Sequence, residues 1–169
     1  GVLGDGRVVR GAQGVGGGGG WFALTPEWRV DYAATGCWEA EAAGPGIARA
    51  AGAADAEAVV GAARRGEATA LAVVERAARY TAMGIANLVS AFDPEVVVLG
   101  GGLGAGAADL LLPMVDNEAR RWAQPVAMAR CRIVGSALGD RAGLLGAARL
   151  ALNLLEGETG RGEGPPSGR

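Results

Sequence analysis

The sequence predicts an α/β fold in which helices pack against short buried strands. A long segment, residues 67–92, carries apolar side chains at three- and four-residue intervals, which is the spacing of an amphipathic helix. Two short apolar runs follow it, at residues 95–99 and 131–134, and each is typical of a strand that is buried on both faces of a mostly parallel sheet. Helical patterns alternate with these two strands, as they do in α/β domains.

The composition limits the chemistry that the chain can perform. Its 169 residues are 50% hydrophobic and carry a formal net charge of −2 at pH 7, which does not favour binding to nucleic acid. The chain contains no histidine, so histidine-dependent catalytic sites and most zinc sites are excluded within it, and any general base must be a carboxylate. No signal peptide or membrane-length apolar run is present. Cys37 and Cys131 have no metal-binding spacing, and we expect reduced thiols in a cytoplasmic protein that does not bind membranes.

The opening residues favour a β-hairpin followed by a loop. Asp5 and Gly6 lie between small and β-branched residues, and this dipeptide is a strong hairpin signal because it tolerates positive φ. The glycines from Gly16 to Gly20 disfavour both helix and strand, so we expect a mobile loop there. The apolar residues 21–24 favour a short strand.

The next part of the chain predicts two helical regions after an irregular segment. Residues 25–35 predict no regular element. The alanine-rich sequence from Cys37 onward predicts a helix that breaks at residues 44–46, which read Gly-Pro-Gly. Asp55 is expected to cap a further helix, which ends near Gly66.

A glycine turn follows the first buried strand. The long helix is expected to end at Asp93, because Pro94 disfavours the α conformation of the residue before it. After the strand, Gly100, Gly101 and Gly102 predict a turn. From the residues alone these glycines have two interpretations: a tight connection between a strand and a helix, or backbone that a phosphate or a purine can approach closely.

The C-terminal third predicts a helix, a strand and a last helix. Pro113 fits the first turn of a helix that reaches Trp122. After the strand at 131–134, Asp140 is expected to cap the last helix. Residues 156–169 are rich in charge, glycine and proline, which predicts a disordered tail. The inner stripe of the last helix is predicted to consist of Leu144, Ala148, Ala151 and Leu155.

Three stretches of the chain resemble parts of one known family. They read GCWEAEAAGPGIAR, NLVSAFDPEVVVLGGG and SALGDRAGLLGAARLAL, and they are similar to segments of the ROK family of sugar kinases and sugar-responsive repressors. The resemblance implies the second lobe of an actin-like or hexokinase-type ATPase fold, with a mixed sheet and packed helices, over residues 1–155. It also implies that the first lobe and the catalytic aspartate lie upstream. We therefore expect a fragment that has no catalytic residue of its own and is inactive alone.

The same resemblance implies two binding sites. Glu39 corresponds to a carboxylate that accepts hydrogen bonds from a sugar, although without the resemblance a solvated glutamate at a helix N-terminus is the better interpretation. Gly100, Gly101 and Gly102 correspond to part of the site for ATP, with magnesium, in the full-length protein. Glu41, by contrast, is expected at the surface.

The chain departs from the family pattern in its glycine-rich loop. Where the family has a glutamate and a histidine in a sequence similar to AGEIGH, this chain reads GGGGGW, with Gly18 and Trp21 at those positions. Trp21 is predicted to pack rather than to stack on a sugar. Of the family's zinc-binding cysteines only Cys37 remains, since Val30 and Tyr32 replace the others, and we therefore predict no structural zinc.

These features support three hypotheses for the function. The first is a sugar kinase-like lobe that binds a hexose or amino sugar and an adenine nucleotide, and that forms homo-oligomers as members of the family commonly do. The alternative is the sugar-sensing effector domain of a transcriptional repressor, which would contact nucleic acid only through an upstream domain absent from this chain. The lost loop glutamate favours a sensor, because a sensor needs only binding that differs between two states. The third is a gene product that has lost both activities.

Overall fold

The computed structural model describes residues 1–155, with the exception of the side chains of Leu103, Ala105, Asp140, Leu154 and Leu155. The chain forms two units. The larger is Gly18–Asp140, and the smaller combines Gly1–Gly17 with the described residues from Arg141 onward. The predicted helix cap at Asp140 and the predicted tail at 156–169 lie outside what the structure describes.

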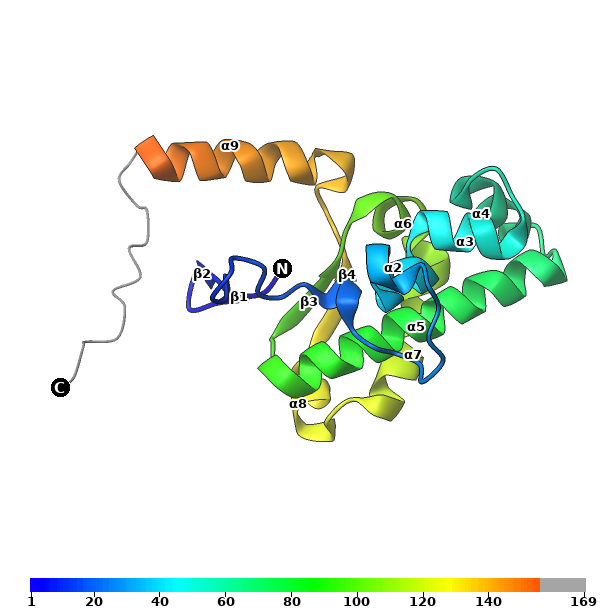
Figure 1. The fold of residues 1–169 in the computed structure, drawn as a ribbon, viewed down its shortest axis with the longest axis horizontal. Coiled ribbons are helices and arrows are strands. Elements are labelled where there is room, and N and C mark those ends of the chain that lie inside the picture. The colour runs from blue at the N-terminus through cyan, green and yellow to red at the C-terminus, as the bar shows by residue number, and fades with distance from the viewer. Residues whose placement is uncertain (156–169) are drawn as a thin grey trace. The chain divides into compact units, whose positions relative to one another are not determined.

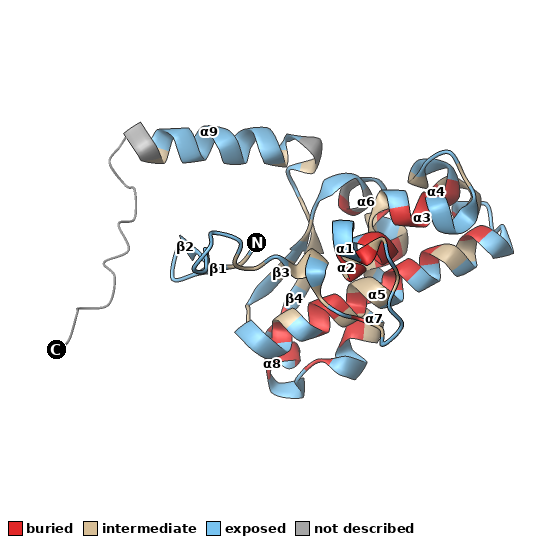
Figure 2. Cartoon of the chain, viewed as in Figure 1, coloured by how far each residue is buried: buried red, intermediate tan, exposed pale blue. Residues whose placement is uncertain are grey.

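The larger unit is organised around one long helix. Helix α5 (Ala68–Phe92) buries a stripe of side chains along its length, and Val74, Ile85 and Val89 are all 0% exposed. Figure 1 shows this helix in green, and Figure 2 shows its buried residues in red. Its main packing partners are α2 (Cys37–Ala42), α3 (Gly44–Ala51), α4 (Ala56–Arg64), α7 (Ala108–Trp122) and α8 (Pro125–Arg130).

Two short parallel strands lie against this helical core. Strand β3 (Val96–Leu99) pairs with β4 (Arg132–Gly135), and Val97 is opposite Ile133. Val97 and Ile133 pack on the core, whereas Val96 is 39% and Val98 56% exposed. The predicted strands are therefore confirmed, but the prediction that β3 is buried on both faces is wrong. A short apolar run indicates a strand without showing how many of its faces are covered.

Several predicted helix boundaries are confirmed. The alanine-rich region does break, but at the extended residue Ala43 rather than at the predicted residues 44–46, which form the first turn of α3; Pro45 fits there because its missing N–H leaves no helical bond unmade. Asp55 caps α4 by accepting a hydrogen bond from the Ala58 backbone N–H at 2.8 Å. Helix α5 ends at Asp93, whose φ is 45°.

Other local features differ from the expectations. No strand forms at residues 21–24; the chain instead makes a 3₁₀ turn, η1 (Gly19–Trp21). Pro113 lies inside α7 rather than in its first turn, because the helix begins earlier, at Ala108. Helix α6 (Gly101–Gly106) was not expected, since glycine has a low helix propensity, and α8 was not expected either. A single helical turn, α1 (Tyr32–Thr35), interrupts the segment that was expected to be irregular.

The smaller unit contains the predicted hairpin. Strand β1 (Leu3–Gly4) pairs antiparallel with β2 (Arg7–Val8). The two turn residues, Asp5 and Gly6, have φ values of 50° and 72°, which is the backbone conformation that this dipeptide tolerates well.

The last helix, α9 (Ala142–Leu155), follows the 3₁₀ turn η2 (Gly139–Arg141). Its predicted buried stripe is wrong for the side chains that the structure describes: Leu144 is 73% exposed, and Ala148 and Ala151 are exposed as well, so the helix is pale blue in Figure 2. Helical spacing identifies an apolar face but not what covers it. None of the helices in the described part of the chain combines the length and the apolarity that a membrane span requires.

Candidate functional site

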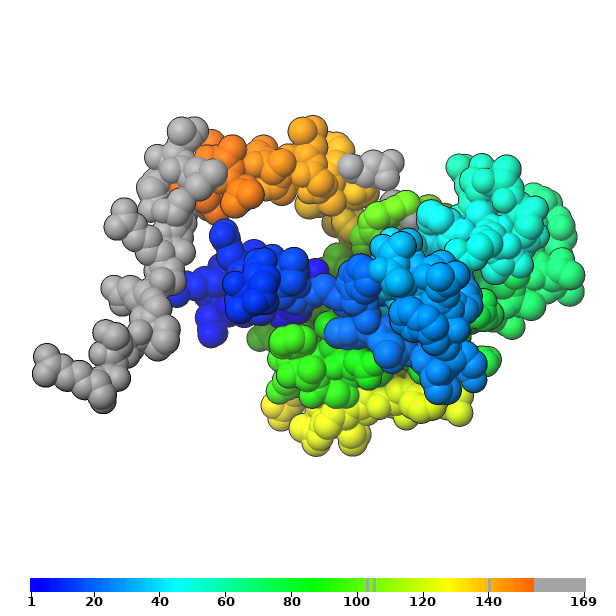
Figure 3. Space-filling model, in the orientation of Figure 1, coloured from blue at the N-terminus to red at the C-terminus, as the bar shows by residue number. Residues whose placement is uncertain are grey.

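Glu39 lies in the first turn of α2, and its side chain is exposed. Its neighbour is the glycine-rich loop, because a β-carbon added to Gly20 would lie 3.5 Å from Cβ of Glu39 and 3.6 Å from its Oε2. In Figure 3 the segment that contains this loop and α2 appears in blue to light blue on the viewed face of the larger unit. The predicted sugar ligand is therefore an exposed carboxylate beside a stretch of backbone without side chains.

Two contacts hold this loop against the start of α2. Gly36 has a φ of 80°, and a β-carbon at this position would overlap the backbone carbonyl of Gly20, so only glycine fits. The ring of Trp38 lies against Gly19, where an added β-carbon would be 2.9 Å away, and it stacks on Phe22 with ring centroids 6.0 Å apart. The loop and α2 thus form one packed segment.

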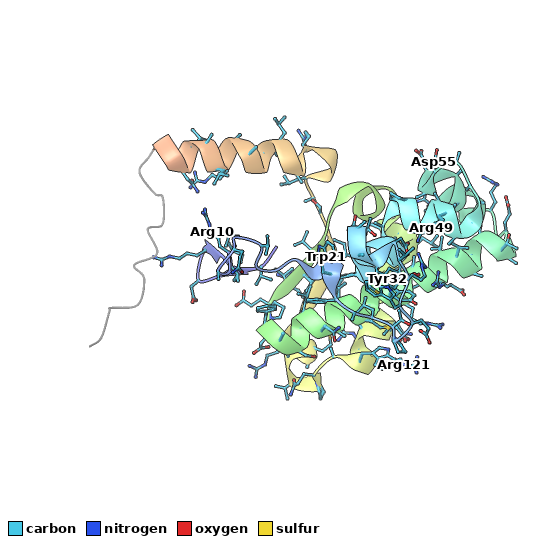
Figure 4. All side chains as sticks on the ribbon, viewed as in Figure 1. Arg10, Trp21, Tyr32, Arg49, Asp55 and Arg121 are labelled. Carbon is cyan, nitrogen blue, oxygen red and sulfur yellow. The ribbon has the colours of Figure 1, made fainter. Side chains whose placement is uncertain are left out.

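Trp21 ends the 3₁₀ turn of this loop and is 60% exposed. Figure 4 labels it at the edge of the larger unit. The prediction that it packs is wrong, because Phe22 takes the stacking position on Trp38 instead. Trp21 directly follows Gly20, the residue beside Glu39, and its exposed ring has an aromatic face open to solvent.

Glu41 lies two residues beyond Glu39, and its side chain is 0% exposed, so the prediction that it lies at the surface is wrong. Its Oε1 accepts a hydrogen bond from the Tyr32 hydroxyl at 2.6 Å and pairs with the Arg29 guanidinium. Its Oε2 lies 2.5 Å from Nη2 of Arg76, a charge–charge contact without the direction of a hydrogen bond. Burial, together with the bond to Glu41, raises the pKa of Tyr32 well above its usual range.

Further ion pairs lie next to the Glu41 carboxylate. Arg29 donates from Nε to Asp31 at 3.0 Å, and this bond lowers the pKa of Asp31 below its usual value. The Arg49 guanidinium lies 3.4 Å from the Asp31 carboxylate and donates to the backbone carbonyl of Ala40 at 2.7 Å. Figure 4 labels Tyr32 and Arg49 in this part of the larger unit. The cluster ties α1, α2, α3 and α5 together.

The positions that correspond to the family's zinc ligands do not fit a zinc ion. Trp21 and Val30 offer no ligand atom, and Val30 is 86% exposed. The Tyr32 hydroxyl already bonds to Glu41, which leaves Cys37 as the one thiol of the set. Within the part of the chain that the structure describes, no three His, Cys, Asp or Glu side chains gather where they could hold a metal. Tetrahedral zinc requires such a set.

The second predicted site is the glycine turn that connects β3 to α6. Gly101 has a φ of 74°, so this position requires glycine for its conformation. β-carbons added at Gly101 or Gly102 would meet no described atom within 4 Å, whereas one at Gly104 would lie 2.5 Å from the carbonyl oxygen of Leu99. The close approach of helix to strand thus depends on Gly104, which the sequence reasoning missed, while Gly102 faces open space.

The far end of α6 is held to a neighbouring helix. Arg64, in the last turn of α4, donates to the backbone carbonyl of Gly106 at 2.7 Å and pairs with Asp109 at 2.6 Å. The hydrogen bond from Arg64 lowers the pKa of Asp109. The glycine turn is therefore open to a ligand on one side and anchored at both ends, a geometry that suits binding through backbone amides.

Known proteins are similar to this chain in sequence. The sequence matches the family model described as ROK family over residues 1–153. A glucokinase of Halalkalibacterium halodurans is 31% identical over an alignment of 167 positions, which covers 86% of this chain and 50% of that protein. An N-acetylmannosamine kinase of Escherichia fergusonii is 35% identical over an alignment of 156 positions, which covers 89% of this chain and 52% of that protein. The chain thus spans about half the length of these curated relatives.

Three solved structures resemble the fold. A ROK hexokinase from Thermus thermophilus has a TM-score of 0.75 at 35% identity, covering 89% of this chain and 52% of its own. A ROK family glucokinase from Streptomyces griseus, in complex with glucose and AMPPNP, has a TM-score of 0.74 at 26% identity, and the match covers 86% of this chain and 54% of that one. A ROK family transcriptional regulator, a homologue of the E. coli MLC protein, has a TM-score of 0.68 at 25% identity, and the match covers 77% of this chain and 37% of that one. The predicted fold class, the second lobe of a hexokinase-type ATPase fold, is confirmed.

Proposed function

The chain belongs to the ROK family, and on that basis we propose that it is the sugar- and nucleotide-binding second lobe of a sugar kinase, formed by residues 1–155. In this proposal a hexose or amino sugar binds at Glu39, and ATP, with magnesium, binds at Gly100, Gly101 and Gly102. Both classes of sugar are represented among the relatives, one of which is a glucokinase and another an N-acetylmannosamine kinase.

The observation that carries the proposal is the open glycine turn after β3. Gly101 and Gly102 are exposed, and the space where a β-carbon would lie is free of described atoms, which supports a close approach of a phosphate or a purine to this backbone. The packing requirement at Gly104 explains one glycine of this region without explaining Gly102. The glucokinase from Streptomyces griseus, whose fold is similar, was solved with AMPPNP, an ATP analogue, and with glucose.

Glu39 supplies the chemistry of the sugar site. A carboxylate accepts two hydrogen bonds from neighbouring hydroxyl groups, and an exposed one near an aromatic ring suits a sugar, whose faces are apolar and whose rim is polar. Trp21, 60% exposed, offers that ring.

The second candidate is the sugar-sensing domain of a repressor. One solved structure with a similar fold is a ROK family transcriptional regulator. The loop that faces Glu39 has no polar side chain from Gly18 to Gly20, which weakens the control of a reacting hydroxyl but still permits sugar binding. A sensor requires only that the sugar bind two states with different affinity.

Calorimetric titration with glucose, N-acetylmannosamine and AMPPNP separates these possibilities. We expect Glu39→Ala to weaken sugar binding by about 1–3 kcal/mol, or roughly 5- to 150-fold in Kd, and to leave AMPPNP binding unchanged. Gly102→Ala should weaken AMPPNP binding by about tenfold or more and leave sugar binding unchanged, because an added methyl group fills the space that the nucleotide needs. Sugar binding without nucleotide binding would favour the sensor, and binding of neither would refute both.

We also propose that the chain forms homo-oligomers. Val98, at 56% exposure, and Leu144, at 73%, are large apolar side chains that a second copy could cover. Sedimentation velocity at several concentrations tests this, and a monomer at every concentration would contradict it.

A further inference from the structure

Glu41 is the buried charged residue of the described chain, at 3% relative exposure. Taking a carboxylate out of water is costly unless cations and hydrogen-bond donors compensate it. Two guanidinium groups and one hydroxyl do so here, from Arg29, Arg76 and Tyr32. Such an arrangement seldom stabilises a fold more than apolar residues of similar volume would, since those often stabilise a core as well. Unlike them, it makes contacts that have fixed directions.

The partners of Glu41 come from different parts of the larger unit. Oε1 meets Arg29, which precedes α1, and Tyr32, which begins α1. Oε2 meets Arg76 on α5. A single carboxylate on α2 therefore pairs both with the segment that leads into this helix and with the long helix behind it. Such charged contacts are more directional than the packing of the buried apolar residues Cys37 and Ala40 on the same helix.

The rotation of α2 decides where Glu39 points. Residues two apart on an α-helix are separated by about 200°, so Glu39 faces outward when Glu41 faces inward. The same rotation sets Trp38 under Gly19 and keeps Gly36 against Gly20. From this geometry we infer that Glu41 is the positioning residue of the sugar site: its buried carboxylate holds Glu39 and the glycine-rich loop in the arrangement that receives the sugar. The inference rests on the proposed function of Glu39.

Arg76 offers a second way to test the clamp. Its side chain is 47% exposed and lines a groove of about 380 Å³ with Pro26 and Tyr80, so a shorter polar side chain there leaves no closed cavity. Removing its charge leaves Glu41 paired with Arg29. A matched control is Glu75, the exposed carboxylate next to Arg76 on α5, which lines the same groove.

The experiment compares Glu41→Gln, Arg76→Gln and Glu75→Gln in the full chain. Hydrogen exchange is followed by mass spectrometry in peptides that cover residues 18–42, and hexose affinity is measured by calorimetry under conditions in which each variant is folded. We expect exchange in these peptides to accelerate roughly tenfold or more in Glu41→Gln, less in Arg76→Gln and not at all in Glu75→Gln. Hexose affinity should fall in the same order. Glu39→Ala should lose affinity without faster exchange.

The outcomes separate the inference from the proposed function. If the wild-type chain binds no hexose, the proposed sugar site fails, while the exchange data still decide whether Glu41 holds this segment. If Glu41→Gln does not fold, Arg76→Gln decides. If both variants are less stable to urea but exchange at residues 18–42 and bind hexose as the wild type does, Glu41 serves stability alone and the inference is overturned.

Discussion

Replacing Gly84 by alanine tests whether Trp38 is seated as the structure shows. Gly84 is buried in α5, and a methyl group there would lie 2.5 Å from Cδ2 and Cε2 of the Trp38 ring. Overpacking of this kind costs about 1–3 kcal/mol. Alanine is a better helix former than glycine by about 0.8–1.0 kcal/mol, so the net loss expected for Gly84→Ala is about 0–2 kcal/mol.

Gly61→Ala is the matched control, because it makes the same substitution inside another helix. Gly61 lies in α4, and a methyl group there would meet only the end of the flexible Arg65 side chain, at 3.6 Å. This variant should gain about 0.8–1.0 kcal/mol from helix propensity. The propensity term cancels between the two variants, so the difference between their free energies of unfolding, about 1–3 kcal/mol, measures the steric contact with Trp38.

Urea unfolding followed by far-ultraviolet circular dichroism gives these free energies, and tryptophan fluorescence reports the local change. Trp21, Trp28 and Trp122 are 60%, 72% and 59% exposed, so the half-buried Trp38 should dominate the blue edge of the emission. We expect Gly84→Ala to red-shift this edge and Gly61→Ala to leave it unchanged. Equal stabilisation of the two variants with identical spectra would show that Trp38 does not rest on Gly84, and the contact of Trp38 with Gly19 in the glycine-rich loop would lose its support.

Three further predictions follow from the described contacts. Asp55→Ala should destabilise the protein by about 1 kcal/mol through loss of the cap on α4, measured by urea unfolding, and an unchanged midpoint would argue against the cap. The folded state raises the pKa of Tyr32 above its ordinary value of about 10, so its contribution to the free energy of unfolding should be fully present below that pH and should be lost as pH rises through the alkaline range. The free energy of unfolding of Tyr32→Phe should therefore fall less over this range. Burial raises the pKa of Cys131 in both proteins, so the contribution of Cys131 cancels in the comparison. Finally, at concentrations where the chain is a monomer, Val98→Thr should change stability by no more than about 0.5 kcal/mol, since Val98 is exposed, and a loss above about 1 kcal/mol in the monomer would mean that this face of β3 is covered by the chain itself.

The features that could be predicted from the sequence are those set by local interactions. Asp55 caps a helix through a backbone N–H three residues away, and Pro94 limits the residue before it, so neither depends on distant parts of the chain. The exposure of Val98 and of Trp21 depends on what packs against them, which no local pattern contains. The helix that begins at Gly101 was missed because its tight contact with β3 overrides the low helix propensity of glycine.

The two glutamates of α2 show most clearly why part of the candidate site could not be predicted. Helical geometry requires Glu39 and Glu41 to face opposite sides, since about 200° separates them, but it does not say which one faces inward. That choice depends on Arg76, which lies far along the chain on α5, and on Arg29, which lies twelve residues before Glu41 and reaches it only after the chain has turned through α1. The resemblance to the family indicated Glu39 as the sugar ligand, and its exposure beside Gly20 is the geometry that this role needs. The positioning role inferred for Glu41 depends on these two arginines, whose positions no local pattern contains. Replacing this ion pair by two apolar side chains, in a variant that combines Glu41→Leu with Arg76→Leu, should therefore keep the helix but release its rotation, and hexose affinity should fall although Glu39 is intact.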